Sequence, residues 1–171
     1  GSEMKSVGEV MAIARSFEEA IQKAIRMLDI GMNGLACNDI SFKNLDKELR
    51  EPTDKRMYAI AEAFKRGYSI EKIHELTKID TWFIYKLKNI LDTKNELQKY
   101  NTISELPLEL LRITKELGFS DFQIARCIFN SEDSDMENAL LKVRDYRIKN
   151  NIVPFVKQID TLAAEYPAQT N

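Results

Sequence analysis

Apolar residues repeat at helical spacing along most of this chain, in segments separated by glycine, proline and short polar runs. From residue 52 onward they recur at i, i+3, i+4 and i+7, which is the spacing of one face of a helix. Pro52, Gly67, Pro107 and Gly118 mark breaks between these segments. The pattern predicts helices at about 17–28, 81–99 and 136–149, a short turn of helix at 45–50, and further helices that begin near residues 52, 69, 107 and 120.

Each predicted helix carries one apolar stripe, which we expect to face a core. A chain of this length can bury such a core, so the pattern predicts an all-α fold. The stripes consist of Phe17, Ala20, Ile21, Ala24, Ile25 and Leu28; Met57, Ile60, Ala61 and Phe64; Ile70, Ile73 and Leu76; Phe83, Leu87, Ile90, Leu91 and Leu97; Leu106, Leu110, Ile113 and Leu117; Ile124, Ala125 and Ile128; and Met136, Leu140, Val143 and Ile148.

Polar residues at the predicted helix starts can bind the first backbone N–H groups, which have no partner inside a helix. Ser16 with Glu19, and Ser120 with Gln123, have the spacing of a capping box, in which each side chain bonds to the backbone N–H of the other residue. The other predicted N-caps are Thr53 or Asp54, Ser69 and Asp80.

Both ends of the chain read as parts of larger units. Residues 4–13 (MKSVGEVMAI) are typical of a β-strand with no partner before it, and residues 157–171 form an apolar, turn-bearing segment that closes no helix. We therefore expect an excised module with a short strand–helix tail at its N-terminus.

One turn between two helices occurs twice in the sequence. Residues 67–69 (GYS) and 118–120 (GFS) each join a helix to a shorter one, and Ile73 and Ile124 follow at the same spacing. The repetition predicts two small helical lobes. The alternative is that glycine and serine propensities produced both turns independently.

The nearly balanced charge argues against a general nucleic-acid binder. The chain has 27 acidic and 25 basic residues, so no basic excess is available for phosphate contacts. No apolar run approaches the roughly 20 residues that span a bilayer, and we expect a cytoplasmic protein with no membrane partner. Cys37 and Cys127 have neither metal nor redox spacing and are expected to be reduced and buried.

The residues show no catalytic, cofactor-binding or metal-site pattern. His74 is the only histidine, and no glycine-rich motif could hold a phosphate. The carboxylate pairs Glu18–Glu19 and Glu48–Glu51 lie where capping or helix solvation explains them. One basic cluster is expected to be a solvated helix face, with a subunit or domain contact as the alternative. It consists of Lys142, Arg144, Arg147 and Lys149.

Residues 69–91 have the outline of a helix-turn-helix motif, in which the second helix would read DNA bases. That helix opens with large apolar rings, whereas base edges are bound by polar side chains. We therefore expect Trp82, Phe83 and Tyr85 to be anchors of an interface or of the core, and we expect no nucleic-acid partner.

The chain resembles the middle part of the carbamoyl-phosphate synthetase large subunit. Its motifs occur in the same order as in that family and cover essentially the whole chain. Residues 4–13, 15–20 and 22–24 resemble the end of the first ATP-grasp half of that family, and residues 157–165 (KQIDTLAAE) resemble the entry to its second half. Ala14 departs from the family, which usually has glycine there.

The central motifs resemble the helical oligomerisation domain of the same family. They are residues 75–80 (ELTKID) with Trp82 and Phe83, and residues 117–121 (LGFSD) with 123–125. Residues 52–56, 67–69 and 167–171 are similar to the eukaryotic glutamine-dependent type, either the multifunctional pyrimidine-pathway protein or the fungal arginine-pathway enzyme.

The resemblance implies a domain order. Residues 1–31 would be the strand–helix tail of the first ATP-grasp half, residues 32–156 the helical oligomerisation domain, and residues 157–171 the linker and the start of the second half. The implied partners are the flanking ATP-grasp domains, a second copy of the chain, and the glutaminase domain or subunit of the parent enzyme.

The family makes carbamoyl phosphate from bicarbonate, glutamine-derived ammonia and two ATP, with Mg²⁺ (or Mn²⁺), for pyrimidine or arginine biosynthesis. The nucleotide and metal sites lie in the flanking halves, so the resemblance implies no catalytic, cofactor-binding or metal residue in this chain and an inactive fragment. Two alternatives stay open, namely a free-standing helical adaptor and ligase activity retained by the isolated chain.

Overall fold

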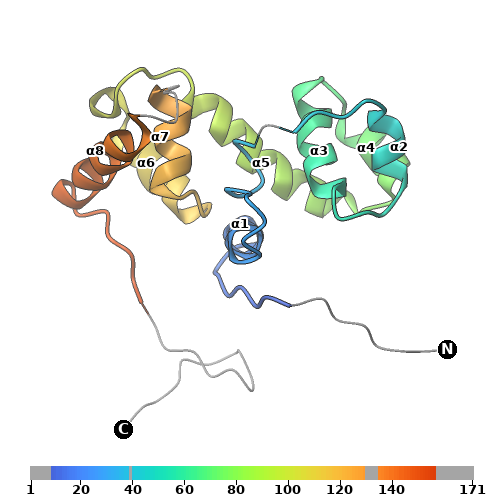
Figure 1. The fold of residues 1–171 in the computed structure, drawn as a ribbon, viewed down its shortest axis with the longest axis horizontal. Coiled ribbons are helices and arrows are strands. Elements are labelled where there is room, and N and C mark those ends of the chain that lie inside the picture. The colour runs from blue at the N-terminus through green and yellow to red at the C-terminus, as the bar shows by residue number, and fades with distance from the viewer. Residues whose placement is uncertain (1–8, 39, 130–134, 157–171) are drawn as a thin grey trace, which may run out of the picture.

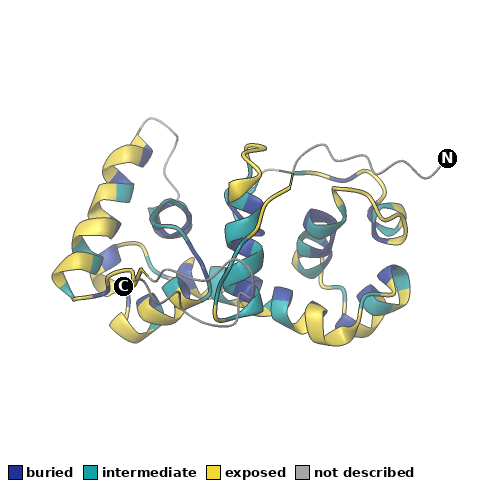
Figure 2. Ribbon diagram, turned by 90° about the horizontal axis from the view of Figure 1, so that it is seen from below, coloured by how far each residue is buried: buried dark blue, intermediate teal, exposed yellow. Residues whose placement is uncertain are grey.

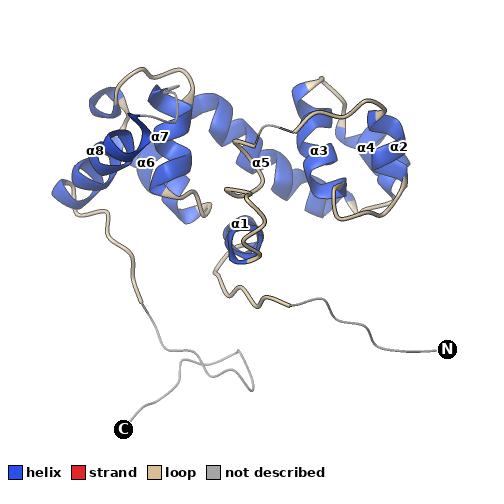
Figure 3. Cartoon of the chain, viewed as in Figure 1, coloured by secondary structure: helices blue, strands red, loops and turns tan. Residues whose placement is uncertain are grey.

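A computed structural model of the chain describes residues 9–38, 40–129 and 135–156. These residues form eight α-helices and one short 3-10 helix and contain no strand (Figure 3), so the predicted all-α class is confirmed. The elements are α1 (Phe17–Met27), α2 (Leu45–Arg50), α3 (Arg56–Lys65), α4 (Ile70–Thr77), α5 (Thr81–Leu97), η1 (Ile103–Glu105), α6 (Leu108–Glu116), α7 (Asp121–Phe129) and α8 (Met136–Lys149).

The helices form two lobes that are joined by α5 (Figure 1). The first lobe contains α2, α3 and α4, and the second contains α6, α7 and α8. The 17-residue α5 packs against α3 and α4 in the first lobe and against α7 in the second. Helix α1 lies between the lobes, against α5. The two lobes expected from the repeated turn are therefore present, and α1 and α5 bridge them.

The core runs through both lobes because the buried face of α5 is continuous. The prediction for this stripe is confirmed at Leu87, Ile90, Leu91 and Leu97, whereas Phe83 is exposed and Ile84 is buried in its place. Figure 2 shows exposed residues on the outer sides of the helices and buried residues where the helices face one another.

The predicted stripe on α1 is confirmed at Ile25, and Phe17 and Ile21 pack partly buried against the core, but this helix also packs through polar residues. Glu18, Gln22 and Ile25 are its buried residues, whereas Leu28 just beyond its end is exposed. Hydrophobic spacing alone could not reveal this face, since Glu18 and Gln22 are buried by hydrogen bonds to distant parts of the chain.

The predicted stripes on α3, α6 and α8 are each confirmed in part, at Ile60, at Leu106, and at Met136 and Val143. Most other predicted positions are only partly buried, and neighbouring residues complete the buried face. In α3 and α8 small alanine side chains occupy the buried centre, and larger apolar residues flank it. In α6 a threonine is buried because its hydroxyl donates to Leu110 O. The buried residues are Tyr58, Ala59, Ile60 and Ala63 in α3, Leu111 and Thr114 in α6, and Met136, Ala139 and Val143 in α8, whereas Ile113 and Ile148 are exposed.

Most of the predicted caps are confirmed. The hydroxyl of Ser16 accepts from Glu19 N (3.2 Å) and that of Ser69 from Lys72 N (3.2 Å). One half of the first capping box was wrong, because the Glu19 carboxylate accepts from Arg15 N rather than from Ser16 N. The predicted cap of α3 was wrong as well. A turn at residues 53–55 makes Lys55 the N-cap residue, and it has no side-chain cap.

The predicted N-terminal strand is not present in the part of it that the structure describes. Residues 9–13 are irregular, because a strand needs a neighbour for its backbone hydrogen bonds and the described residues supply none. Residues 4–8 of that prediction, and the whole of residues 157–171, lie outside the described residues.

The repeated turn is the same structure at both places. Gly67 and Gly118 have φ angles of +79° and +85°, the left-handed conformation that ends a helix. The next residue then donates its N–H back across the last helical turn, from Tyr68 N to Ala63 O (2.9 Å) and from Phe119 N to Thr114 O (3.2 Å). Both turns thus have the Schellman hydrogen bond, followed in each case by a serine cap.

The two turns differ in what surrounds the glycine, which yields a matched pair of variants. A Cβ on Gly67 would meet nothing within 4 Å, whereas a Cβ on Gly118 would lie 2.8 Å from Glu19 Cα. We expect Gly67→Ala to lower the free energy of unfolding by about 1 kcal/mol through backbone strain alone. Gly118→Ala should lower it by about 3 kcal/mol, because α1 must also move. Urea unfolding followed by circular dichroism measures both, and equal losses would contradict the close packing of α1 on this turn.

Candidate interaction site

Helix α5 begins with aromatic residues that the fold brings to the surface. The turn before it is fixed by Lys78, which ends α4 at φ +59°, and by Asp80, whose carboxylate accepts from Trp82 N (2.8 Å). The exposed fractions of Trp82, Phe83 and Tyr85 are 52%, 42% and 53%. All three predicted anchors therefore lie at the surface of the described structure.

Trp82 and Phe83 form an aromatic cluster with Phe17 of α1. The ring centroids are 5.8 Å apart for Phe17 and Trp82, 5.3 Å for Phe17 and Phe83, and 4.9 Å for Trp82 and Phe83, all with edge-to-face geometry. Such pairs contribute roughly 0.5–1.5 kcal/mol each beyond the burial of their area. The aromatic cluster thus fastens the start of α1 to the start of α5 while leaving about half of each α5 ring exposed.

A buried carboxylate lies next to the aromatic cluster. Glu18 is only 2% exposed, and its Oε1 accepts from Asn89 Nδ2 (2.9 Å) and lies 3.3 Å from Lys86 Nζ. The same ammonium is 5.3 Å from the centroid of the Trp82 ring. Among the described residues no donor reaches the second oxygen, Oε2, which is also buried. The sequence analysis explained Glu18 by capping or helix solvation, and no local pattern marks it as a buried group.

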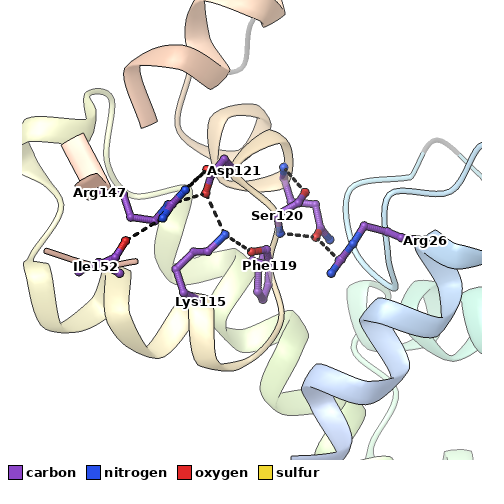
Figure 4. A network of polar contacts seen from close by, with 8 residues as sticks. Arg26, Lys115, Phe119, Ser120, Asp121, Arg147 and Ile152 are labelled. Carbon is purple, nitrogen blue, oxygen red and sulfur yellow. Dashed lines mark hydrogen bonds and ion pairs between the residues drawn. The ribbon is translucent and has the colours of Figure 1, made fainter. Parts of the chain in front are cut away.

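The second lobe is organised around Asp121 (Figure 4). Its carboxylate accepts from Lys115 Nζ (2.8 Å) and from Arg147 Nη2 (2.9 Å). Lys115 also donates to Phe119 O, and Arg147 donates to Ile152 O, so one carboxylate ties α6, α7 and α8 to the segment after α8. The basic cluster was predicted to be a solvated helix face, and this is wrong for Arg147, whose side chain is largely buried against Asp121. Lys142, Arg144 and Lys149 are exposed.

The ionisation of this network follows from its partial burial. Burial alone would raise the pKa of Asp121, but hydrogen bonds from Arg147 and Lys115 outweigh it and hold the pKa below its usual range. Burial lowers the pKa of Lys115, and the hydrogen bond to Asp121 opposes this effect. The native network therefore favours an ionised Asp121.

A chain of buried amides joins α1 to the second lobe. Gln22 Nε2 donates to Leu117 O (2.9 Å), and Gln123 Nε2 donates to Gln22 Oε1 (2.9 Å). Gln123 Oε1 in turn accepts from Ser120 N (3.0 Å), which completes the predicted capping box, and from Arg26 Nη1 (3.1 Å; Figure 4). The pKa of Arg26 is lowered by burial, against the raising effect of Glu19.

The described residues show no arrangement typical of a catalytic or metal site. No three His, Cys, Asp or Glu side chains among them are placed to hold a metal ion. The Nδ1 atom of His74 is hydrogen-bonded to Ile79 O (2.7 Å) at the edge of the core. Nor does any of the described helices have the length and apolar character to cross a bilayer.

Comparison with known proteins gives a consistent set of relatives. Residues 9–150 match the family model described as the oligomerisation domain of the carbamoyl-phosphate synthetase large chain. The chain is 52% identical over 171 residues to the multifunctional protein pyr1-3 of Dictyostelium discoideum. It is 50% identical over 172 residues to the arginine-specific large chain of carbamoyl phosphate synthase from Eremothecium gossypii, and 48% identical over 172 residues to the mitochondrial arginine-specific large chain of Neurospora crassa. These alignments include 99% or 100% of this chain but only 7%, 15% and 14% of the respective relatives.

The geometry around Asp121 predicts a large effect of its neutralisation. We expect Asp121→Asn to lower the free energy of unfolding near pH 7 by about 2–3 kcal/mol, because Arg147 and Lys115 lose a partly buried charged partner. The matched control is Glu109→Gln, which removes an exposed carboxylate 4.0 Å from Arg112 and should change stability by less than about 0.5 kcal/mol. Urea unfolding of both variants measures the difference.

The same comparison has a predicted pH dependence. The pKa of Asp121 is lower in the native state than in the unfolded state. The ionised carboxylate therefore contributes its full stabilisation above the unfolded pKa, and this stabilisation is lost as the pH falls through the native pKa. The advantage of the wild type over Asp121→Asn should therefore shrink between about pH 5 and pH 2. A constant advantage over this range would contradict an ionised Asp121 in the native network.

Proposed function

Since the chain belongs to the oligomerisation-domain family of the carbamoyl-phosphate synthetase large chain, we propose that it works as a helical spacer and self-association module within a much longer synthetase. The parent enzyme would make carbamoyl phosphate from bicarbonate, glutamine-derived ammonia and two ATP, with Mg²⁺ bound in the flanking halves. A cytoplasmic location stays a prediction, because the relatives include a protein named as mitochondrial.

The role of spacer is supported by how the polar groups of the chain are used. The buried charges and amides that the structure describes mainly join one helix to another, as Asp121 does with Lys115 and Arg147. This is the arrangement expected of a module whose task is to hold a fixed shape. The relatives carry this segment within much longer chains, and nothing in the comparison supports a free-standing adaptor.

Helix α1 has a particular place in this proposal. The predicted boundary at residue 31 assigns α1 to the preceding half, yet Gln22 and Arg26 bind the second lobe and Phe17 packs on α5. We propose that α1 is the connection through which the preceding half is held against both lobes. The boundaries at residues 31 and 156 stay predictions.

The observation that carries the self-association proposal is the surface at the start of α5. Trp82 and Tyr85 are each more than half exposed, and Trp and Tyr are enriched at the centres of protein interfaces. We therefore propose that this surface contacts a second copy of the chain.

Sedimentation velocity over a concentration series tests the proposal. We expect the mean mass of the chain to rise with concentration, and Trp82→Ala or Tyr85→Ser to weaken the association at least about tenfold, as for an interface hot spot. Trp82 is the only tryptophan, so its fluorescence should shift to shorter wavelength as the wild type associates. Circular dichroism checks that each variant keeps its helices.

The matched control is Leu141→Ala, which removes another exposed apolar side chain, on α8. This variant should associate as the wild type does. A wild-type chain that stays monomeric at every concentration would contradict self-association, and equal weakening by Leu141→Ala would contradict the location of the surface.

A further inference from the structure

The two cysteines of the chain meet across the fold although they are 90 positions apart in the sequence. Cys37 lies in the loop between α1 and α2, and Cys127 lies on α7. Their Sγ atoms are 3.2 Å apart, and the structure has both as thiols. The sequence analysis found no redox spacing because it considered only residues that are close together in the chain. Its prediction that both cysteines are buried is confirmed for Cys127 but not for Cys37, which is partly exposed.

The loop holds Cys37 in a conformation that few residues with a side chain adopt. Its φ angle is +67°, in the left-handed region, and such strain persists only where the surroundings enforce it. The surroundings here are specific. Arg126 Nη1, one residue before Cys127, donates to Cys37 O (3.2 Å), and Asn38 Nδ2 donates to Gly34 O (2.7 Å).

The rest of the loop is fixed to the same helices. Gln123 Nε2 donates to Gln22 Oε1 and lies 3.5 Å from Ala36 O. Gly34 packs so tightly here that a Cβ would lie 2.6 Å from Gln22 Oε1 and 2.7 Å from Gln123 Nε2. The position of Cys37 opposite Cys127 is therefore set by α1 and α7 and is not a chance approach of a loose loop.

We propose that Cys37 and Cys127 are a site of reversible disulfide formation that cross-links the α1–α2 loop to α7. A covalent S–S bond is about 2.05 Å long, so the two sulfur atoms need to approach by roughly one ångström. A change in the side-chain torsion of the partly exposed Cys37 can supply this movement. The bond would fasten the entry of the first lobe to a helix of the second.

The oxidant is a small-molecule disulfide such as oxidised glutathione. The Cys37 thiolate attacks one of its sulfur atoms, which forms a mixed disulfide and releases one small thiolate. The Cys127 sulfur, after losing its proton, then attacks the Cys37 sulfur and releases the second small thiolate. The two cysteine protons end on the two released thiols. Cys37 attacks first because it is the more accessible, and because the hydrogen bond with Cys37 and burial raise the pKa of the Cys127 thiol.

Intact-protein mass spectrometry of the folded chain with oxidised glutathione tests the proposal. The wild type should lose two hydrogen atoms, keep no glutathione, and give a linked peptide pair containing Cys37 and Cys127 after proteolysis. Because the bond closes a long loop, the oxidised form should melt about 5–10 °C higher than the reduced form. Dithiothreitol should reverse both changes.

The two single variants separate the steps. Cys127→Ala should accumulate a glutathione adduct on Cys37 and gain no thermal stability, whereas Cys37→Ser should stay largely unmodified because Cys127 is buried. If a variant does not fold, the linked peptide pair of the wild type still decides the question. Three results would overturn the proposal. They are glutathione adducts that persist on the wild type, disulfide-linked dimers, and thiols that stay reduced in the folded chain while the urea-unfolded chain oxidises. None of these readouts depends on self-association.

Discussion

The hydrogen bond between the fully buried side chains of Gln22 and Gln123 is the contact on which the rest of the structure depends. It joins α1 to α7, residues that are 101 positions apart. Through its other atoms the pair also binds Leu117 O at the end of α6 and the backbone of Ser120 at the start of α7. Buried amides of this kind must be fully bonded, because in a low-dielectric interior an unbonded one is expensive. One pair of side chains therefore fixes α1, the α1–α2 loop and the second lobe relative to one another.

The Gln22–Gln123 hydrogen bond makes the module rigid, because it fixes α1 against the second lobe. Helix α5 supplies the continuous apolar core of both lobes, and α1 is fastened to it at one end by the aromatic cluster and to the second lobe at the other by Gln22 and Arg26. A segment attached to α1 would then be held against the whole module and not against one lobe. Such rigidity suits the proposed role of a spacer within a longer chain.

Local features of the structure could be predicted from the sequence, because their causes lie within a few residues. The bounds of α2 and α8 were predicted residue for residue, and so were the caps at Ser69, Asp80 and Ser120. The buried alanines of α3 and α8 were missed for a different reason, since hydrophobicity does not show where small alanine side chains allow close packing. The aromatic residues at the start of α5 were identified as anchors, but only the fold shows them at the surface.

Contacts between distant segments could not be predicted, because nothing in the local pattern marks them. Gln22, Glu18 and Asp121 look like ordinary surface residues of amphipathic helices. Yet Gln22 and Glu18 are buried and Asp121 is partly buried, each against partners elsewhere in the fold. The same holds for Cys37 and Cys127, whose meeting depends on a left-handed residue and on the docking of the α1–α2 loop. The features that distinguish this module from other helical proteins are therefore the ones that need the structure.

The most direct test of this account is native-state hydrogen exchange of the backbone amides of α1, α5 and α7. If the Gln22–Gln123 hydrogen bond makes these three helices one cooperative unit, the slowest amides of each helix should open with the same free energy. Gln123→Ala should then lower this opening free energy in all three helices together. The account would be contradicted if the slowest amides of α1 had a much lower opening free energy than those of α5 and α7. It would also be contradicted if Gln123→Ala lowered the opening free energy in α7 alone.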